Sequence, residues 1–215
     1  MGPTAAQPAS PSQMPRPDRR TRAPGDRSRA LVLEQAAALA TLDGLDGVSI
    51  ARLAEATGMP KSSVYALFGS KEQLQLETID TARVSLITHV IAPVISTTSP
   101  GRDRLQGLCD GYLDYVEHRV FPGGCFFVGA AADVGGRRGP VRDRVADYQR
   151  QWSDLLVQTA SDAQAAGEIT PDADPDQLAF ELGAILAGAN LAAVLQDDNT
   201  IIHRARRAVR SRLDG

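Results

Sequence analysis

The chain contains only two lysines, Lys61 and Lys71, and both lie in one short stretch that is rich in hydroxyl side chains. Every other strongly basic side chain is an arginine. A lysine ammonium is a compact point charge on a flexible stem, which suits it to pair with phosphate. The placement of both lysines beside serines and a tyrosine predicts a surface that binds the phosphates of DNA.

The charge of the chain is distributed unevenly along its length. The formal net charge is -3, which argues against a general nucleic-acid binder. Residues 16–71, however, carry nine Arg and Lys against six Asp and Glu, whereas residues 72–198 carry nine against nineteen. Such asymmetry indicates a division of labour, with the basic end facing an anionic partner. Residues 199–215 are basic again, and we interpret them as the solvated face of a last helix.

The segment before the lysines predicts two helices. Residues 27–42 carry apolar side chains at helical spacing, and Gly44 is expected to end that helix. Ser49 is a suitable N-cap for the next helix, because its hydroxyl can accept a bond from a free backbone N–H of the first turn. The inward face of this second helix is expected to be Ile50, Leu53 and Ala54.

The lysine segment predicts a tight corner followed by two more helices. Gly58 supplies the positive φ that a steep crossing of helices requires, and a helix from Pro60 to Leu67 or Phe68 follows it. Ser70 and Gln73 have the spacing of a capping box, so a further helix begins at Lys71 and is expected to run to Pro93. The partial positive charge of its N-terminus adds to that of Lys71, and the expected occupant is a DNA phosphate.

The motifs of this region follow one another in a dense and ordered set over residues 27–78. They are Gly47-Val48-Ser49-Ile50, Leu53-Ala54, Gly58-Met59-Pro60-Lys61, Val64-Tyr65, Phe68 and Ser70-Lys71-Glu72-Gln73-Leu74. This set resembles the DNA-binding domain of the TetR/AcrR family of transcriptional regulators. The resemblance implies an all-α fold, in which a three-helix helix-turn-helix domain (25–71) is joined by a linker helix to a helical ligand-binding and dimerisation domain (72–215).

The resemblance also implies roles for individual residues. Tyr65 and Lys71 match positions that contact the DNA backbone, and Ser49 and Ser63 match hydroxyl positions that bind a phosphate or a base edge. Phosphate contacts set the register, whereas base edges in the major groove carry the sequence information. The expected DNA-binding residues are Ser49, Lys61, Ser62, Ser63, Tyr65 and Lys71, with Lys61, Ser62 and Ser63 directed toward the bases.

Two departures from the family pattern leave the operator sequence undefined. Pro60 replaces the commoner serine-type cap, and Ala66-Leu67 replaces a pair that is often aromatic or polar. An alternative interpretation makes Tyr65 and Phe68 only core residues and leaves both lysines solvated. The density of the motif set disfavours that alternative.

The C-terminal part predicts further helices over residues 101–119, from Pro140 to near Gly167, and after Asp174-Pro175. A short apolar segment spans residues 125–132. The helix after Pro175 is apolar around much of its circumference, which in water demands burial on more than one side. We expect this helix and the long helix from Pro140 to form a two-fold interface in a homodimer, which agrees with the four-helix contact that the family resemblance implies. The expected interface residues are Leu178, Leu182, Ile185, Ala189 and Ala192.

A ligand pocket is expected among the middle helices. An apolar and aromatic lining favours a small hydrophobic or aromatic effector, although each candidate taken singly is more often a core residue. His89 is interpreted as a core or surface histidine, and we expect no metal and no cofactor. Cys125 as a redox sensor is an alternative that no basic neighbour supports. The candidates are Leu86, His89, Val90, Tyr112, Tyr115, Phe126, Phe127, Tyr148 and Trp152.

Several other features of the sequence have simple interpretations. Residues 1–24 are expected to be a disordered, basic, proline-rich arm, solvated or laid along DNA. They lack the apolar core of a signal peptide, and Glu181 and Asn190 interrupt the most apolar run, so we expect a cytoplasmic protein outside the membrane. The loop 135–139 is interpreted as a solvated basic loop rather than a phosphate cradle.

Three classes of function follow from these observations. The first is a homodimeric transcriptional repressor that a small molecule releases from a palindromic operator. The second is a helical carrier or interaction protein that keeps the fold without specific DNA binding. An enzyme is not expected, because the sequence contains no GxSxG, HExxH, P-loop or paired-carboxylate constellation.

Overall fold

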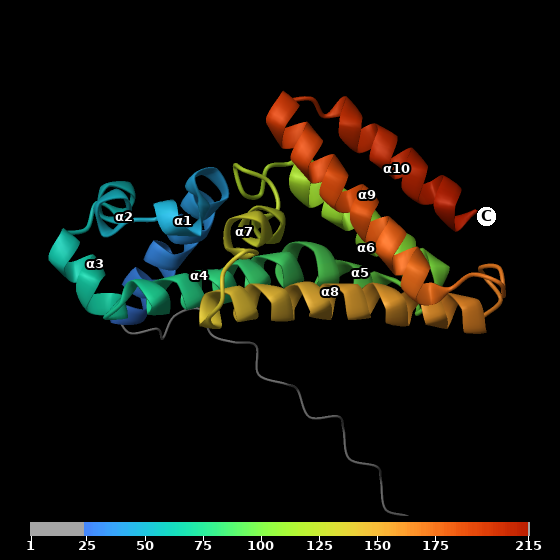
Figure 1. The fold of residues 1–215 in the computed structure, drawn as a ribbon, viewed down its shortest axis with the longest axis horizontal. Helices are drawn as coiled ribbons and strands as arrows, with labels where there is room; N and C mark the ends of the chain where they lie inside the picture. The colour runs from blue at the N-terminus through green and yellow to red at the C-terminus, as the bar shows by residue number, and fades with distance from the viewer. Residues whose placement is uncertain (1–23, 215) are drawn as a thin grey trace, which may run out of the picture.

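The structure is a computed structural model that describes residues 24–214. Within this range every regular element is helical, which confirms the all-α expectation (Figure 1). The expected arm lies, except for Pro24, outside the described residues. The helices are α1 (Pro24–Gly47), α2 (Ile50–Thr57), α3 (Lys61–Phe68), α4 (Lys71–Leu86), the π-helical turn η1 (Ile87–Ile91), α5 (Ala92–Thr97), α6 (Arg102–Glu117), α7 (Phe126–Val134), α8 (Pro140–Ala165), α9 (Pro175–Gln196) and α10 (Thr200–Leu213).

The N-terminal unit consists of α1, α2, α3 and the start of α4. Gly44 interrupts α1 with a φ of +74°, and Gly58 turns the chain between α2 and α3 with a φ of +68°. Both glycines therefore occupy the left-handed region that other residues adopt only at a cost. Four buried apolar side chains fill the inside of the corner between α2 and α3: Leu53, Ala54, Val64 and Phe68.

The linker is one continuous helical rod from Lys71 to Thr97, and the expectation that it ends at Pro93 is wrong. Just before the proline the helix widens into the π turn η1, in which the amide of Ala92 donates to the carbonyl oxygen of Ile87. Pro93 then occupies the first turn of α5, where the missing N–H breaks no helical bond. The rod continues past the proline for this reason.

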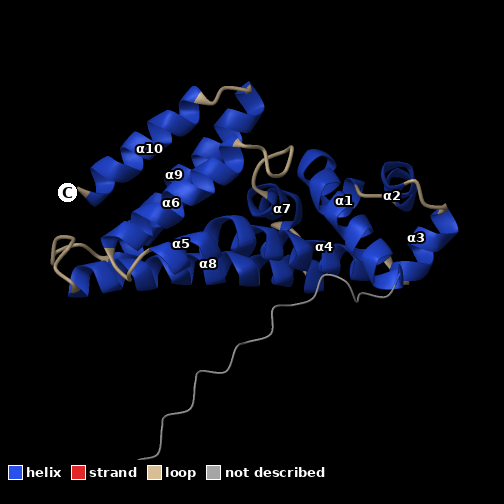
Figure 2. Cartoon of the chain, turned by 180° about the vertical axis from the view of Figure 1, so that it is seen from behind, coloured by secondary structure: helices blue, strands red, loops and turns tan. Residues whose placement is uncertain are grey.

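The remaining helices pack on this rod and on one another. Helix α8 packs against α4, α9 packs on α8 and α6, and α10 packs on α9 and α6 (Figures 1 and 2). Helix α7 lies between α1 and α8 and is the main contact of this body with the N-terminal unit. Two hydrogen bonds fix that contact: Gly123 N donates to Thr41 Oγ1 at 3.0 Å and Leu45 N donates to Asp133 Oδ2 at 2.9 Å.

Two helical stretches are long and apolar enough to cross a membrane by length and composition alone, Lys71–Thr97 and Pro175–Gln196. Both pack along their length against other helices of the chain: the first against α1, α6 and α8, and the second against α6, α8 and α10. Core helices of helical proteins share this composition. Helix α9 buries Leu178, Leu182, Leu186 and Ala193 against its neighbours.

Candidate DNA-binding surface and ligand cavity

Helix α3 presents a polar face to solvent. Lys61, Ser62 and Ser63 are exposed in its first turn, while Val64 and Phe68 on the opposite face are buried. The Tyr65 side chain is 62% exposed, although its size would allow it to be buried. An exposed aromatic beside serines and a lysine is suited to contact a partner rather than to support the core. The structure thus places these predicted residues together on one surface.

A hollow of about 260 Å³ lies beside this surface and is here called the phosphate groove. The N-termini of α2 and α4 both face it, capped by Ser49 and Ser70. Such helix ends present free backbone N–H groups and a partial positive charge, which favour an anion. Its lining residues are Asp46, Val48, Ser49, Ile50, Tyr65, Phe68, Gly69, Ser70, Lys71 and Leu74.

Only half of the expected capping box forms at the start of α4. Ser70 Oγ accepts a hydrogen bond from Gln73 N at 3.0 Å, as expected. The Gln73 amide, however, donates to Glu77 Oε1 at 2.7 Å instead of returning to the backbone of Ser70. Ser70 N donates to Phe68 O at 2.8 Å, so the cap is completed by the preceding turn.

Asp46 is a member of the phosphate groove that the sequence did not indicate. Lys71 Nζ donates to the backbone oxygen of Asp46 at 2.9 Å and lies 3.5 Å from its carboxylate oxygen Oδ1. The other carboxylate oxygen is paired with Arg137, from the loop between α7 and α8. These partners, first Arg137, then the amide of Gln75 and the charge of Lys71, lower the pKa of the Asp46 carboxyl below its ordinary value.

A cavity of about 270 Å³ lies between α4, α6, α7, α8 and α9, and is here called the ligand cavity. Five of the predicted ligand residues line it: Leu86, Tyr112, Phe127, Tyr148 and Trp152. The sequence did not indicate the other lining residues, because several come from the outward side of α9. They are Cys125, Val128, Gln149, Ser153, Ala179, Phe180, Gly183, Ala184, Leu186 and Ala187.

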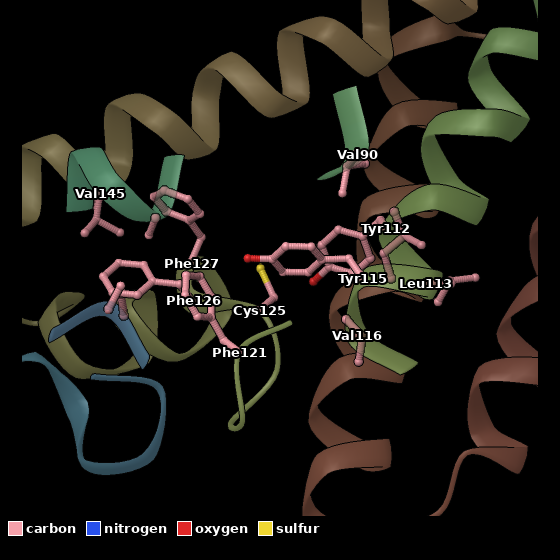
Figure 3. Close-up of a cluster of buried hydrophobic side chains, with 14 of the residues drawn as sticks. Val90, Tyr112, Leu113, Tyr115, Val116, Phe121, Cys125, Phe126, Phe127 and Val145 are labelled. Atoms are coloured by element: carbon pink, nitrogen blue, oxygen red, sulfur yellow. The ribbon is translucent and has the colours of Figure 1, made fainter. Parts of the chain in front are cut away.

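Aromatic rings form two walls of the ligand cavity. Tyr112 stacks on Trp152 with ring centroids 6.0 Å apart, and Phe127 meets Tyr148 edge to face at 5.9 Å. The side chain of Cys125 points toward Tyr112 and Tyr115 of α6 (Figure 3). Burial raises the pKa of the Cys125 thiol and raises that of Tyr112, so both groups stay neutral. A neutral buried thiol is a poor redox sensor, which disfavours that alternative for Cys125.

The other four predicted ligand residues do not line this cavity, and a ligand role for them stays a prediction. Phe126 packs against Phe121 and Phe127 in the core, because α7 turns it away from the cavity. His89, Val90 and Tyr115 line a separate groove between the linker rod and α6. A single helix cannot present all its apolar side chains to one cavity, and α6 directs Tyr112 and Tyr115 to different sides.

Polar bonds tie the ligand cavity to the linker helix. The hydroxyl of Tyr148 donates to Asp80 Oδ1 at 2.8 Å, and Arg144 Nη1 donates to both Asp80 oxygens at 2.6 and 2.7 Å. The guanidinium of Arg83 lies 5.0 Å from the centre of the Tyr148 ring. One wall of the cavity is therefore anchored on α4, the helix that begins at Lys71.

Comparisons with known proteins agree with this arrangement. Residues 32–78 match the model of the bacterial regulatory proteins of the tetR family. Residues 101–209, half of the chain, match the model of the tetracyclin repressor-like C-terminal domain. The chain belongs to the TetR family. It is a TetR-family transcriptional regulator with a helix-turn-helix unit and a helical C-terminal domain.

Individual TetR-family proteins are similar over most of the chain. The HTH-type transcriptional repressor ComR of Escherichia coli (strain K12) is 25% identical over 165 residues, which is 77% of this chain and 79% of that protein. A TetR transcriptional regulator from Chloroflexus aurantiacus J-10-FL has a TM-score of 0.78 at 29% identity, covering 86% of this chain and 93% of the other. AibR, solved in complex with isovaleryl coenzyme A and operator DNA, shares the fold with a TM-score of 0.62 at 24% identity, covering 75% and 84%.

The residues expected at a TetR-family dimer interface differ in burial within one chain, and their role at an interface stays a prediction. Leu178, Leu182 and Ala189 face the core of their own chain, and Ile185 and Ala192 are half-buried. The exposed side of α9 instead carries Phe180, Leu191 and Leu195, together with Ala184 and Gly188. The helix is apolar all round, so its sequence does not distinguish the two sides.

Proposed function

We propose that this protein is a homodimeric cytoplasmic repressor, without enzymatic activity, that binds a palindromic operator and is released from it by a small apolar or aromatic ligand. The observation that carries the proposal is the exposed polar face of α3 beside the phosphate groove. There Lys71, two capped helix N-termini and Tyr65 line a groove beside the exposed first turn of α3. This arrangement suits a helix in the major groove that is flanked by phosphates.

In this proposal the six predicted residues divide into two groups. Ser49, Tyr65 and Lys71 hold the DNA backbone from the phosphate groove. Lys61, Ser62 and Ser63, in the first turn of α3, approach base edges. A helix of eight residues reads few bases. Two copies whose recognition helices lie about 34–36 Å apart read two half-sites and so restore specificity.

The exposed side of α9 is the surface that we assign to the dimer. Phe180 and Leu195 are 71% and 86% exposed, and Leu191 lies between them on the same side. Contiguous apolar surface of this kind usually marks an interface. Gly188 and Ala184 have small side chains that allow a second helix to approach closely. A second copy placed by a two-fold axis would bury the same face of both chains.

The ligand cavity supports a small apolar or aromatic effector. Its walls are aromatic rings and small α9 residues, with Gln149, Ser153 and the Tyr148 hydroxyl as the polar groups that would orient a ligand. AibR, the relative solved with both a coenzyme A ester and operator DNA, supports the combination of the two functions in one chain. A ligand that displaces Tyr148 would act on Asp80 of α4 and so on the spacing of the two recognition helices.

Selection of DNA sites from a random pool tests the proposal directly. The purified chain should enrich a palindrome, and Lys71→Ala and Tyr65→Phe should bind the enriched site more weakly, since each removes a phosphate contact. Tyr65→Phe is the milder change, because it keeps the ring and removes only the hydroxyl. If no palindrome is enriched, the repressor proposal fails, and a helical carrier without specific DNA binding becomes the better interpretation.

A further inference from the structure

Asp46 lies between the two halves of the molecule. It belongs to the last turn of α1, in the N-terminal unit, and it lines the phosphate groove. One carboxylate oxygen accepts a hydrogen bond from Gln75 Nε2 at 2.9 Å and lies 3.5 Å from Lys71 Nζ. The other oxygen is paired with Arg137, which belongs to the loop between α7 and α8. An acid of the DNA-binding unit is thus held by a base of the ligand-binding body.

The negative charge of Asp46 is unfavourable for phosphate binding, which is the function that we propose for the groove. A carboxylate at the edge of a phosphate groove repels the phosphate, and it also draws the ammonium of Lys71 toward itself. Lys71 already donates to the backbone oxygen of Asp46 at 2.9 Å. Arg137 pairs with the carboxylate oxygen that does not face Lys71, and it supplies a permanent positive charge.

The loop that carries Arg137 is itself held in place. Arg137 Nη2 lies 3.5 Å from Asp133 Oδ1 of α7, and the other oxygen of Asp133 accepts the bond from Leu45 N at 2.9 Å. Glu72, Arg138 and Arg142 line the same recess as Asp46 and Arg137. Among the residues that the structure describes, no ion pair involves Arg138, although it is the next residue and is also exposed.

We propose that Arg137 is a positioning residue of the phosphate site: by neutralising Asp46 it leaves Lys71 available for DNA, although it need not touch the DNA itself. The inference rests on the proposed function in one respect, the assignment of Lys71 as a phosphate anchor. It also gives the ligand-binding body a route to the DNA site, since α7 and α8 flank this loop and supply Phe127, Val128, Tyr148 and Trp152 to the ligand cavity.

The experiment measures operator affinity for four single variants and one double variant. Arg137→Gln removes the neutralising charge, and Arg138→Gln removes the same charge from the adjacent position as a matched control. Asp46→Asn removes the acid, and Arg137→Gln with Asp46→Asn removes both. Arg137→Lys restores the charge. The probe is the palindrome enriched by selection, titrated at about 50 mM and about 200 mM salt, because screening weakens exposed charges.

We expect Arg137→Gln to bind the operator about threefold to fivefold more weakly than Arg138→Gln at low salt, with a smaller difference at high salt. Arg137→Lys should retain most of the affinity. Asp46→Asn alone should bind at least as tightly as the parent chain. In the Asp46→Asn background, Arg137→Gln should have no more effect than Arg138→Gln, because no acid remains to be neutralised.

Three results would overturn the inference. Equal affinities of Arg137→Gln and Arg138→Gln would show that Arg137 contributes only a positive charge near the DNA, as Arg138 does, and has no specific effect through Asp46. Equal weakening by Arg137→Gln and by Asp46→Asn would show that the pair merely joins the two halves of the molecule. An undiminished loss in the Asp46→Asn background would show that Arg137 contacts DNA directly. Failure of the parent chain to bind any selected site would instead overturn the proposed function, and this inference with it.

Discussion

The phosphate groove and the ligand cavity are assembled from the chain in different ways. The groove is lined by one short stretch of chain, residues 46–74, and its functional groups are exposed, charged or hydroxylic. The ligand cavity is lined from α4, α6, α7, α8 and α9, and most of its lining is aromatic or aliphatic. One site is a product of local sequence, and the other exists only when distant helices are packed together.

This difference has consequences for how each site tolerates change. A local site depends on capped helices and tight turns, so its geometry persists while the small unit remains folded. A site between long helices depends on every contact that sets their spacing, because packed interiors transmit small shifts. The ligand cavity is therefore the part of the molecule suited to respond to a ligand. The phosphate groove keeps its backbone geometry, and the Asp46–Arg137 pair connects it to the ligand-binding body.

The largest expected effect concerns the dimer interface that we propose on α9. Leu191→Arg places a charge on the exposed side of α9 and should convert the proposed dimer to a monomer. Operator binding should weaken by at least about 100-fold, because two linked half-sites gain their affinity together. Light scattering and DNA titration measure the two effects. Leu42→Arg in α1 is the control, because Leu42 is 59% exposed and Leu191 is 56% exposed. It should alter neither the oligomeric state nor operator binding. A dimer that survives Leu191→Arg would exclude the exposed side of α9 as the interface.

The next prediction concerns a single polar contact at the ligand cavity. Asn190, buried on α9, accepts a hydrogen bond from Cys125 N at 2.7 Å and so holds the chain entering α7. Asn190→Ala leaves that buried N–H without a partner and should lower the free energy of unfolding by about 1–3 kcal/mol. Denaturant unfolding is the measurement. Asn199→Ala, at an exposed position whose side chain makes no capping bond, is the control and should have almost no effect.

A smaller effect should separate the two lysines of the DNA surface. Lys71→Gln removes a phosphate contact, so it should weaken binding to every sequence by about tenfold and reduce the salt dependence. Lys61→Gln should instead reduce the preference for the operator over random DNA, since Lys61 lies in the first turn of α3. Titrations with both duplexes at several salt concentrations provide the comparison. A uniform loss from Lys61→Gln would assign Lys61 to the backbone as well.

The same contrast explains what the sequence could predict. The helix boundaries, the corner at Gly58 and the exposed face of α3 follow from caps, glycines and spacing within a few residues. The inward face of α9 does not, because Leu178 and Leu191 are equally apolar and only packing decides which is buried. The pair of Asp46 and Arg137 is separated by 91 residues and has no local signal. The passage of the rod through Pro93 depends on a π turn that periodicity does not reveal.

The smallest expected effect concerns the lowered pKa of Asp46 and its contribution to stability. In the phosphate groove, partners lower the pKa of Asp46, whereas in the core burial raises the pKa of the Cys109 thiol to about 12. A lowered carboxyl pKa contributes stability above the unfolded value of about 3.9, and that stability is lost as the pH falls through the folded value. Since the Asp46 side chain is 45% exposed, solvent screening should keep this contribution below about 1 kcal/mol.

At neutral pH, the free energy of unfolding of Asp46→Asn should therefore differ from that of the parent chain only by a small offset. Between about pH 5 and about pH 3, Asp46→Asn should lose less stability than the parent chain. Arg137→Gln should shift the pH dependence of stability in the same direction, because it removes the main cause of the lowered pKa. Arg138→Gln should leave that dependence unchanged. An acid dependence that is identical in all four proteins would mean that the Asp46–Arg137 pair is too solvated to affect stability. The link between the N-terminal unit and the ligand-binding body would then rest on the hydrogen bonds from Leu45 N to Asp133 Oδ2 and from Gly123 N to Thr41 Oγ1.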